Sequence, residues 1–156
     1  GRAISETTND ALRMDLRKKN WYIFDENFGT SIEKKFIRFV DTMMEDLQEK
    51  YEEIFLFRNE KEITLYRFSD GKAMEPDFLL FMTKKDTKEE VSYQIFIESK
   101  GGHLIEQDSW KEKVLLEVEG SAKVEYLLEN HEFRVLGMPF FVESDGRFQE
   151  AFMTRF

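Results

Sequence analysis

The sequence contains no cysteine, and none of its apolar stretches approaches the length of a membrane-spanning helix. The absence of cysteine excludes disulfide bonds and thiolate metal sites, and it suits a reducing compartment. No secretory signal peptide is evident at the start of the chain. We therefore expect a cytoplasmic protein that does not contact a membrane.

Positive charge is also scarce, because 23 lysines and arginines stand against 32 aspartates and glutamates, a formal net charge of −9. Phosphate binding relies on basic side chains that displace counterions, so a domain of this charge should bind DNA weakly by itself. The chain also has no Gly-x-x-x-x-Gly-Lys-Ser/Thr phosphate loop. Any ATP-driven step would then require a domain outside this chain.

The remaining composition is that of a folded domain. The 156 residues correspond to one domain, and 41% of them are hydrophobic. Sixteen phenylalanines supply much of the bulk for a core. The sequence therefore predicts a globular rather than a disordered chain.

Residues 1–29 differ in character from the rest of the chain. The first part is polar and irregular, with a short helix suggested over Asp10–Leu16, and the chain begins with glycine rather than methionine. We interpret 1–29 as a linker and N-terminal anchor from an upstream domain, and 30–156 as the folded domain. Three aromatic residues, Trp21, Tyr22 and Phe24, lie near the end of this segment. We interpret them as anchors that hold the segment to the domain, with stacking on nucleic-acid bases as the less favoured alternative.

Thr30–Tyr51 is predicted to be a helix, because its apolar residues recur every three to four positions. That stripe consists of Ile32, Phe36, Phe39, Val40, Met43, Leu47 and Tyr51. Thr30 and Glu33 have the spacing of a capping box, in which a hydroxyl and a carboxylate bind free amides of the first turn.

Two apolar runs of strand length, Phe78–Met82 and Val91–Ile97, form the centre of the predicted fold. Both are apolar on both faces, as expected of central strands covered on each side. Further strands are predicted over Glu53–Phe57, Ile63–Phe68 and Glu132–Val142, with Pro139 at an edge or a bulge. Lys123–Leu128 fits either a strand or a helix.

Two more helices complete the predicted fold. Ser109–Glu119 has a capping-box pair in Ser109 and Glu112, and Gly120 is a natural end for it. A short terminal helix would turn Phe148, Phe152 and Phe156 toward the core. The order of elements predicts an α/β fold with a mixed central β-sheet flanked by helices on both sides.

Charged residues lie at the ends of the two central runs. Asp77 precedes the first run, and Glu98, Ser99 and Lys100 follow the second. Since side chains alternate faces along a strand, Glu98 and Lys100 should point to one side and Ser99 to the other. If the runs pair, Asp77 lies beside Glu98. Two carboxylates and an ammonium at one place suit a hard cation such as Mg²⁺ with a phosphate substrate.

The pair Pro76-Asp77, twenty intervening residues and then Glu98-Ser99-Lys100 resemble the PD-(D/E)xK nuclease motif. The continuation from Ile97 to Gly101 is most similar to the C-terminal endonuclease domain of type III restriction enzymes and related helicase–nuclease subunits. The resemblance covers roughly Thr30 to Phe141. It implies a restriction-endonuclease-like core and Mg²⁺-dependent cleavage of DNA phosphodiesters.

The resemblance also implies roles for individual residues. Asp77 and Glu98 would bind Mg²⁺, for which Mn²⁺ would substitute, together with the backbone carbonyl of Ser99. Lys100 would position the attacking water or offset developing negative charge. Glu33 would reach the metal through water, a role that competes with helix capping for the same side chain.

Substrate contacts are expected from residues that follow the motif. Lys111 and Lys113, on the second predicted helix, are candidates for DNA contact, and His103 is a candidate for a phosphate. For all three, simple exposure to solvent is the alternative. The Gln-x-x-x-Tyr signature of nucleases fused to RecB-type helicases is absent from this helix.

The implied partners are double-stranded DNA, an upstream helicase or translocase domain of the same polypeptide that uses ATP, and a methyltransferase or specificity subunit. The alternative is a catalytically silent nuclease-like module for DNA docking or protein interaction, which the acidic balance favours. The intact set of Asp77, Glu98 and Lys100 speaks against it, since paired buried carboxylates are costly without a cation. The number of metals and the choice between DNA and RNA stay open.

Overall fold

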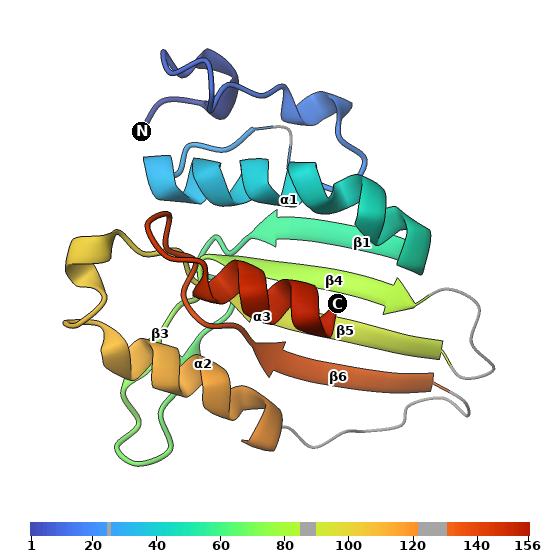
Figure 1. Cartoon of the computed structure of the whole chain (residues 1–156). Helices are drawn as coiled ribbons and strands as arrows, with labels where there is room; N and C mark the ends of the chain where they lie inside the picture. Colours follow the sequence, from blue (N-terminus) through green and yellow to red (C-terminus); the bar gives the residue numbers. More distant parts are fainter. Residues whose placement is uncertain (25, 85–89, 122–130) are drawn as a thin grey trace.

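A computed structural model describes residues 1–24, 26–84, 90–121 and 131–156. The protein is a mixed α/β structure around a four-stranded sheet of order β1-β4-β5-β6 (Figure 1). The strands are β1 (Tyr51–Arg58), β4 (Phe78–Lys84), β5 (Glu90–Ile97) and β6 (His131–Gly137). The pairs β1/β4 and β4/β5 are antiparallel and β5/β6 is parallel, which confirms the expected mixed sheet.

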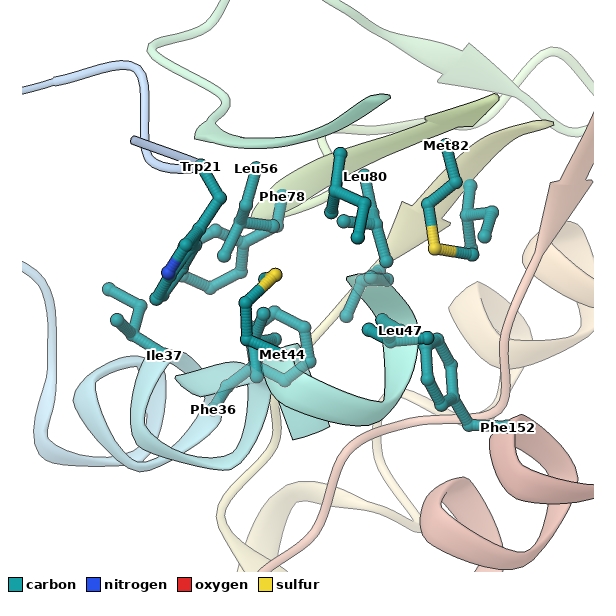
Figure 2. Close-up of a cluster of buried hydrophobic side chains, with 14 of the residues drawn as sticks. Trp21, Phe36, Ile37, Met44, Leu47, Leu56, Phe78, Leu80, Met82 and Phe152 are labelled. Carbon is teal, nitrogen blue, oxygen red and sulfur yellow. The ribbon is translucent and has the colours of Figure 1, made fainter. Parts of the chain in front are cut away.

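One face of the sheet is covered by α1 (Ser31–Lys50) and by α3 (Arg147–Arg155). Figure 2 shows Phe36, Ile37, Met44 and Leu47 of α1 pointing into a core that also contains Phe152 of α3. The sheet contributes alternate residues to this core, including Leu56, Phe78, Leu80 and Met82. The helix predicted over Thr30–Tyr51 and the inward phenylalanines of the terminal helix are confirmed.

The other face is covered by α2 (Ser109–Ser121), whose Val114 and Leu115 pack on Leu79 and Phe96 of the sheet. Helices therefore cover both faces, as expected. The helix continues past Gly120, so the predicted end at that glycine is wrong.

The predicted capping box of α2 is also wrong. Ser109 donates its amide to the carbonyl of Glu106 at 3.4 Å. The Glu112 carboxylate instead accepts hydrogen bonds from the Phe140 amide, at 2.9 Å, and from the Arg147 guanidinium. These tertiary partners satisfy the carboxylate, so it does not turn back to its own helix.

The strand predicted over Ile63–Phe68 is shorter in the structure, where only β2 (Leu65–Tyr66) pairs with β3 (Ala73–Met74). The Asn59 side chain explains the late start, because it binds both the amide and the carbonyl of Ile63. That backbone is thus satisfied by a side chain rather than by a neighbouring strand. The strand β6 likewise ends at Gly137, before Pro139, which has no amide to donate.

The N-terminal segment packs along α1 and supplies part of the core. Ile4, Met14, Leu16 and Trp21 are buried there. The segment that we interpreted as a linker therefore contributes to the hydrophobic core of the domain. The short helix predicted over Asp10–Leu16 is not formed. Two 3₁₀ helices, Ile4–Glu6 and Leu16–Lys18, occur instead, and the Asp15 side chain caps the second.

Trp21 and Tyr22 are buried, which confirms their predicted role as anchors and argues against base stacking by either ring. Phe24 is 40% exposed and contacts the edge of the Tyr22 ring. Lys123–Leu128 lies outside the described residues. Within the described part of the chain, no helix is both long and apolar enough to cross a membrane.

β6 packs tightly against α2 at Gly137. A β-carbon there would lie 2.2 Å from the carbonyl oxygen of Leu115 and 2.8 Å from its α-carbon. We expect Gly137→Ala to lower the free energy of unfolding by about 1–3 kcal/mol, because α2 would have to shift. Urea denaturation would measure this, with Gly146→Ala as the control since nothing lies within 4 Å of its added carbon. Equal stability of the two variants would contradict the prediction.

Candidate active site

The two motif halves meet at one end of the central sheet. Phe78 pairs with Ile97 in the antiparallel β4/β5 ladder. Asp77 directly precedes Phe78, and Glu98 directly follows Ile97, so the register brings the two carboxylates to neighbouring positions. The expected pairing of the two central strands is thereby confirmed.

Asp77 is held in place from both sides of the chain. Its Oδ2 atom accepts hydrogen bonds from the amide of Ser99, at 2.9 Å, and from the Ser99 hydroxyl, at 2.7 Å. Its carbonyl accepts from the Asn59 amide at 2.7 Å, and the Asn59 side chain donates to the Pro76 carbonyl at 2.9 Å. Burial raises the pKa of Asp77 above its usual value, and the Ser99 hydrogen bonds only partly oppose this.

Glu98 is 5% exposed, and its two carboxylate oxygens differ in their surroundings. Oε1 lies 3.1 Å from the ammonium of Lys100. Oε2 is buried and accepts no hydrogen bond from any described residue. Burial, and then the charge of Asp77, raise the pKa of Glu98 to about 7. A desolvated carboxylate oxygen without a partner is a costly feature that a bound cation would stabilise.

Lys100 points to the same side as Glu98, as the alternation of strand side chains predicts. Its ammonium also contacts Oδ2 of Asp108 at 2.6 Å, and the ammonium of Lys111 lies 3.5 Å from the same oxygen. Burial acts to lower the pKa of Lys100, but its hydrogen bonds to Asp108 and Glu98 prevail and raise it. Lys100 therefore stays an ammonium rather than a neutral base.

Glu33 has the capping role that its spacing predicted. Its carboxylate binds the Thr30 amide while the Thr30 hydroxyl accepts from the Glu33 amide, so both halves of the capping box are present. The other oxygen, Oε1, lies 3.2 Å from Nε of Arg58. The charge of Glu33 contributes to the raised pKa of Asp77. A contact from Glu33 to a metal through water stays a prediction.

The three expected substrate-binding residues have different surroundings. Lys111 joins the cluster through Asp108. Lys113 is exposed on α2. His103 is exposed as well, and its ring lies close over Gly101, where a β-carbon would come within 3.0 Å of it. Only Lys111 is thus brought to the carboxylates.

Sequence reasoning missed three residues that shape the site: Asn59, Arg58 and Asp108. The sequence contained a weak indication of the role of Asp108. An acidic residue directly before a predicted helix is favoured by the helix dipole, and such a residue can pair with a nearby lysine. Asn59 and Arg58 lie in a polar turn, and nothing local in the sequence shows that they reach Pro76 and Glu33.

The residues present suit Mg²⁺. Two desolvated carboxylates supply oxygen ligands, which this ion prefers. The parallel bridge between Ser99 and Phe141 uses the carbonyl of Glu98 and the amide of Lys100, so it leaves the Ser99 carbonyl unused. No group of three or more histidine, cysteine or acidic residues arranged to hold a metal occurs in the described ranges. Any cation here would therefore rely on the two carboxylates, a backbone carbonyl, water and substrate oxygens.

Comparison with known proteins gives two matches. A curated protein of Haemophilus influenzae (strain ATCC 51907 / DSM 11121 / KW20 / Rd), described as an uncharacterized protein, is 35% identical over 136 residues, which cover 82% of this chain. The matched region spans 29% of that relative's length. No solved structure matches the chain. A family model described as HI_1054_C, C-terminal domain, matches residues 7–155. Because that match takes in nearly the whole chain, the protein belongs to the HI_1054_C family of C-terminal domains.

Proposed function

We propose that this chain is a metal-dependent endonuclease domain of the restriction-endonuclease-like type, which hydrolyses DNA phosphodiester bonds. The observation that carries the proposal is the buried Oε2 atom of Glu98, which accepts no hydrogen bond from any described residue, at the end of the strand pair that also carries Asp77. Lys100 completes the set at 3.1 Å from the other Glu98 oxygen. Two carboxylates and an ammonium at the end of paired strands are the groups that such hydrolysis requires.

Each residue has a defined task in this mechanism. Asp77 and Glu98 would hold Mg²⁺, with the Ser99 carbonyl as a further ligand. When bound, the ion supplies an activated water and stabilisation of charge on the phosphate. Ser99 fixes the orientation of Asp77 through two hydrogen bonds. Lys100, kept protonated by Asp108 and Glu98, directs its charge at the phosphate oxygens, where negative charge develops.

The wider setting is proposed as well. The matched region covers less than a third of the curated relative, which leaves room for further domains in a protein of that length. We propose an upstream ATP-dependent helicase or translocase domain, a methyltransferase or specificity subunit, and a cytoplasmic restriction system that acts on double-stranded DNA. DNA held by other domains would offset the net charge of −9.

A catalytically silent docking module is the second candidate. This alternative is favoured by the two ion pairs that Lys100 already forms, one with Glu98 and one with Asp108. In a silent module, these ion pairs would hold Glu98 and Asp108 without a metal. The two candidates therefore differ in whether a divalent cation enters between Asp77 and Glu98.

Crystals of the protein soaked in Mn²⁺ would test the proposal through an anomalous difference map. We expect a peak at coordination distance, about 2.0–2.3 Å, from oxygens of both Asp77 and Glu98. The Asp77→Asn variant, soaked in the same way, should lose that peak. Mn²⁺ bound only elsewhere, with the Glu98–Lys100 pair unchanged, would overturn the nuclease proposal and favour the docking module.

A further inference from the structure

The hairpin formed by β2 and β3 is a second feature at the same end of the molecule. It lies beside α2, and its return strand leads directly into Pro76-Asp77 (Figure 1). Phe68 is 83% exposed and Tyr66 is 61% exposed. Large rings left this open to water have free faces on which another flat group would stack. The hairpin thus carries two open aromatic rings, and the chain runs from its second strand to Asp77.

Cations gather on one indole ring between the hairpin and the site. The ammonium of Lys72 lies 4.1 Å from the centre of the Trp110 ring, the Arg67 guanidinium 5.4 Å and the ammonium of Lys111 5.9 Å. Asp70 neutralises Arg67 through a bidentate ion pair. No carboxylate among the described residues forms an ion pair with Lys72. Lys111 pairs with Asp108, and the charge of Glu117, which lines the adjoining cavity, acts on Arg67. Lys72 is therefore the cation of this group that no described carboxylate pairs.

The cation cluster is continuous with the candidate active site. Lys111, beside Trp110 on the first turn of α2, shares the Asp108 carboxylate with Lys100. A phosphate bound between Lys72 and Lys111 would therefore lie next to the group that we assign to transition-state stabilisation. This arrangement suits a polyanion that extends from the site onto the hairpin.

A cavity of about 320 Å³ lies between the hairpin and α2. It is lined mainly by apolar and aromatic side chains, among them Tyr66, Phe68, Phe96, Val114 and Val118. Phe96 lies one residue before the end of β5 and Glu98 directly follows the strand, so the alternation of side chains puts both on the same side of the sheet at a spacing of about 7 Å. The cavity therefore opens on the face that carries the carboxylates, and its size is at the lower limit of about 300 Å³ for small-ligand sites.

We propose that this hairpin surface, formed by Tyr66, Phe68, Lys72, Trp110, Lys111 and the adjoining cavity, binds unpaired nucleotides of a single-stranded nucleic acid. One base would stack on the exposed rings or enter the cavity, and the neighbouring phosphates would contact Lys72 and Lys111. The assignment of this strand as substrate rests on the proposed nuclease function. The assignment of the surface as a binding site does not.

The aromatic rings decide between a single strand and a duplex. Bases within a duplex are stacked on one another and would not meet the faces of Phe68 and Tyr66. Single-strand sites combine basic grooves with aromatic platforms on which successive bases stack. An apolar peptide would use the rings but not the adjacent cations. Single-stranded nucleic acid uses both, so it is the occupant that these observations favour.

Fluorescence anisotropy with a labelled oligothymidylate of about 12 nucleotides, in EDTA to prevent cleavage, would test the inference. We expect tighter binding of this strand than of a duplex of equal length. Phe68→Ala should weaken binding roughly 5- to 100-fold, the range found when a stacked base loses its ring. Lys72→Ala should weaken binding and reduce the slope of log K against log salt by about 0.7. Both side chains are exposed, so neither variant should unfold.

Matched controls come from residues outside the hairpin surface. Phe28 is 57% exposed just before α1, and Lys18 is an exposed lysine of the N-terminal segment. Phe28→Ala and Lys18→Ala should bind the oligonucleotide as the wild type does. Unchanged binding by Phe68→Ala and Lys72→Ala, or equal binding of duplex and single strand, would overturn the inference.

The same measurement separates this inference from the nuclease proposal. Oligothymidylate binding is measured in EDTA, so it does not depend on a metal at Asp77 and Glu98. Hairpin-dependent binding without a Mn²⁺ site at Asp77 and Glu98 would refute the nuclease proposal alone. A Mn²⁺ site together with hairpin-independent oligonucleotide binding would refute the single-strand surface alone.

Discussion

Replacing Asp77 with asparagine is expected to abolish Mn²⁺ binding and to reduce the rate of DNA cleavage by a factor of roughly 10³ or more. This factor corresponds to the several kcal/mol by which a metal stabilises the transition state. The fold should persist, because an asparagine carbonyl oxygen still accepts the two hydrogen bonds from Ser99. Single-turnover cleavage of an end-labelled duplex, with protein in excess and Mn²⁺ present, would measure the rate. Isothermal titration would measure the affinity for Mn²⁺.

Lys100→Met should separate chemistry from metal binding. Removing the ammonium leaves Asp77 and Glu98 to bind Mn²⁺, while cleavage should fall roughly 10²- to 10³-fold, as when one stabilising group is lost from a transition state. The matched controls are Asp46→Asn and Lys18→Met, since both side chains are exposed and belong to no part of the site. Cleavage at the wild-type rate by Asp77→Asn and Lys100→Met would remove the catalytic assignment. Loss of Mn²⁺ binding in Lys100→Met would instead make the lysine part of the metal site.

The core of the fold was predictable because its signals are local and strong. The apolar spacing from Ile32 to Leu47 specifies one buried helical stripe, and the Thr30–Glu33 capping box fixes where that helix begins. Phe78–Met82 and Val91–Ile97 are apolar on both faces, and they became the central strands β4 and β5. The meeting of Asp77 with Glu98 follows from that pairing and from the two-residue period of a strand.

Predictions went wrong where a distant group satisfies a polar atom. Glu112 has the spacing of a helix cap, yet the Phe140 amide and Arg147, 28 and 35 residues away, bind it. Ile63 begins a stretch with strand character, yet the Asn59 side chain binds its backbone. In both cases the local pattern was compatible with the prediction, and a tertiary hydrogen bond outweighed it.

The same limit applied to the site. Asp108 contacts Lys100 only because the turn before α2 folds back over the end of β5. The N-terminal segment gave no periodic signal, since Ile4 and Leu16 reach the core from two separate three-residue 3₁₀ helices and Met14 from the irregular backbone between them. Residues of this kind are defined by the assembled fold rather than by spacing along the chain.

The pH dependence of stability is the second large effect that we expect. The pKa of Glu98 is raised from 4.5 to about 7 in the folded protein, and that of Asp77 is raised as well. Between pH 4.5 and about pH 7, the folded protein therefore keeps a proton on Glu98 that the unfolded chain has already released. Since the unfolded state binds fewer protons, the free energy of unfolding must fall as the pH rises through this window. For Glu98 alone the decrease is about 3 kcal/mol.

Other carboxylates do not mask this decline. Hydrogen bonds from Lys100 and Arg67 lower the pKa of Asp108 and Asp70, respectively. The stability that these two carboxylates contribute is therefore already fully present once the pH exceeds their ordinary pKa of about 4. Urea denaturation in EDTA at several values from about pH 5 to about pH 8 would measure the effect. Glu98→Gln is the matched variant, because it keeps the volume of the side chain and removes the titrating group. The difference in stability between the two proteins should change by about 3 kcal/mol over this range.

Mg²⁺ should reverse the decline, because the cation binds the deprotonated carboxylates that the folded protein otherwise disfavours. Its affinity should rise roughly tenfold per pH unit below about pH 7 for each proton displaced, and binding to the folded state alone adds stability. With Mg²⁺ present, the wild type should therefore be more stable near pH 8 than in EDTA, and Glu98→Gln should show little gain. A wild type whose stability in EDTA rises between about pH 5 and pH 7 relative to Glu98→Gln would contradict the raised pKa of the buried Glu98 carboxylate. A decline that Mg²⁺ leaves unchanged would mean that this carboxylate pair is not a cation site.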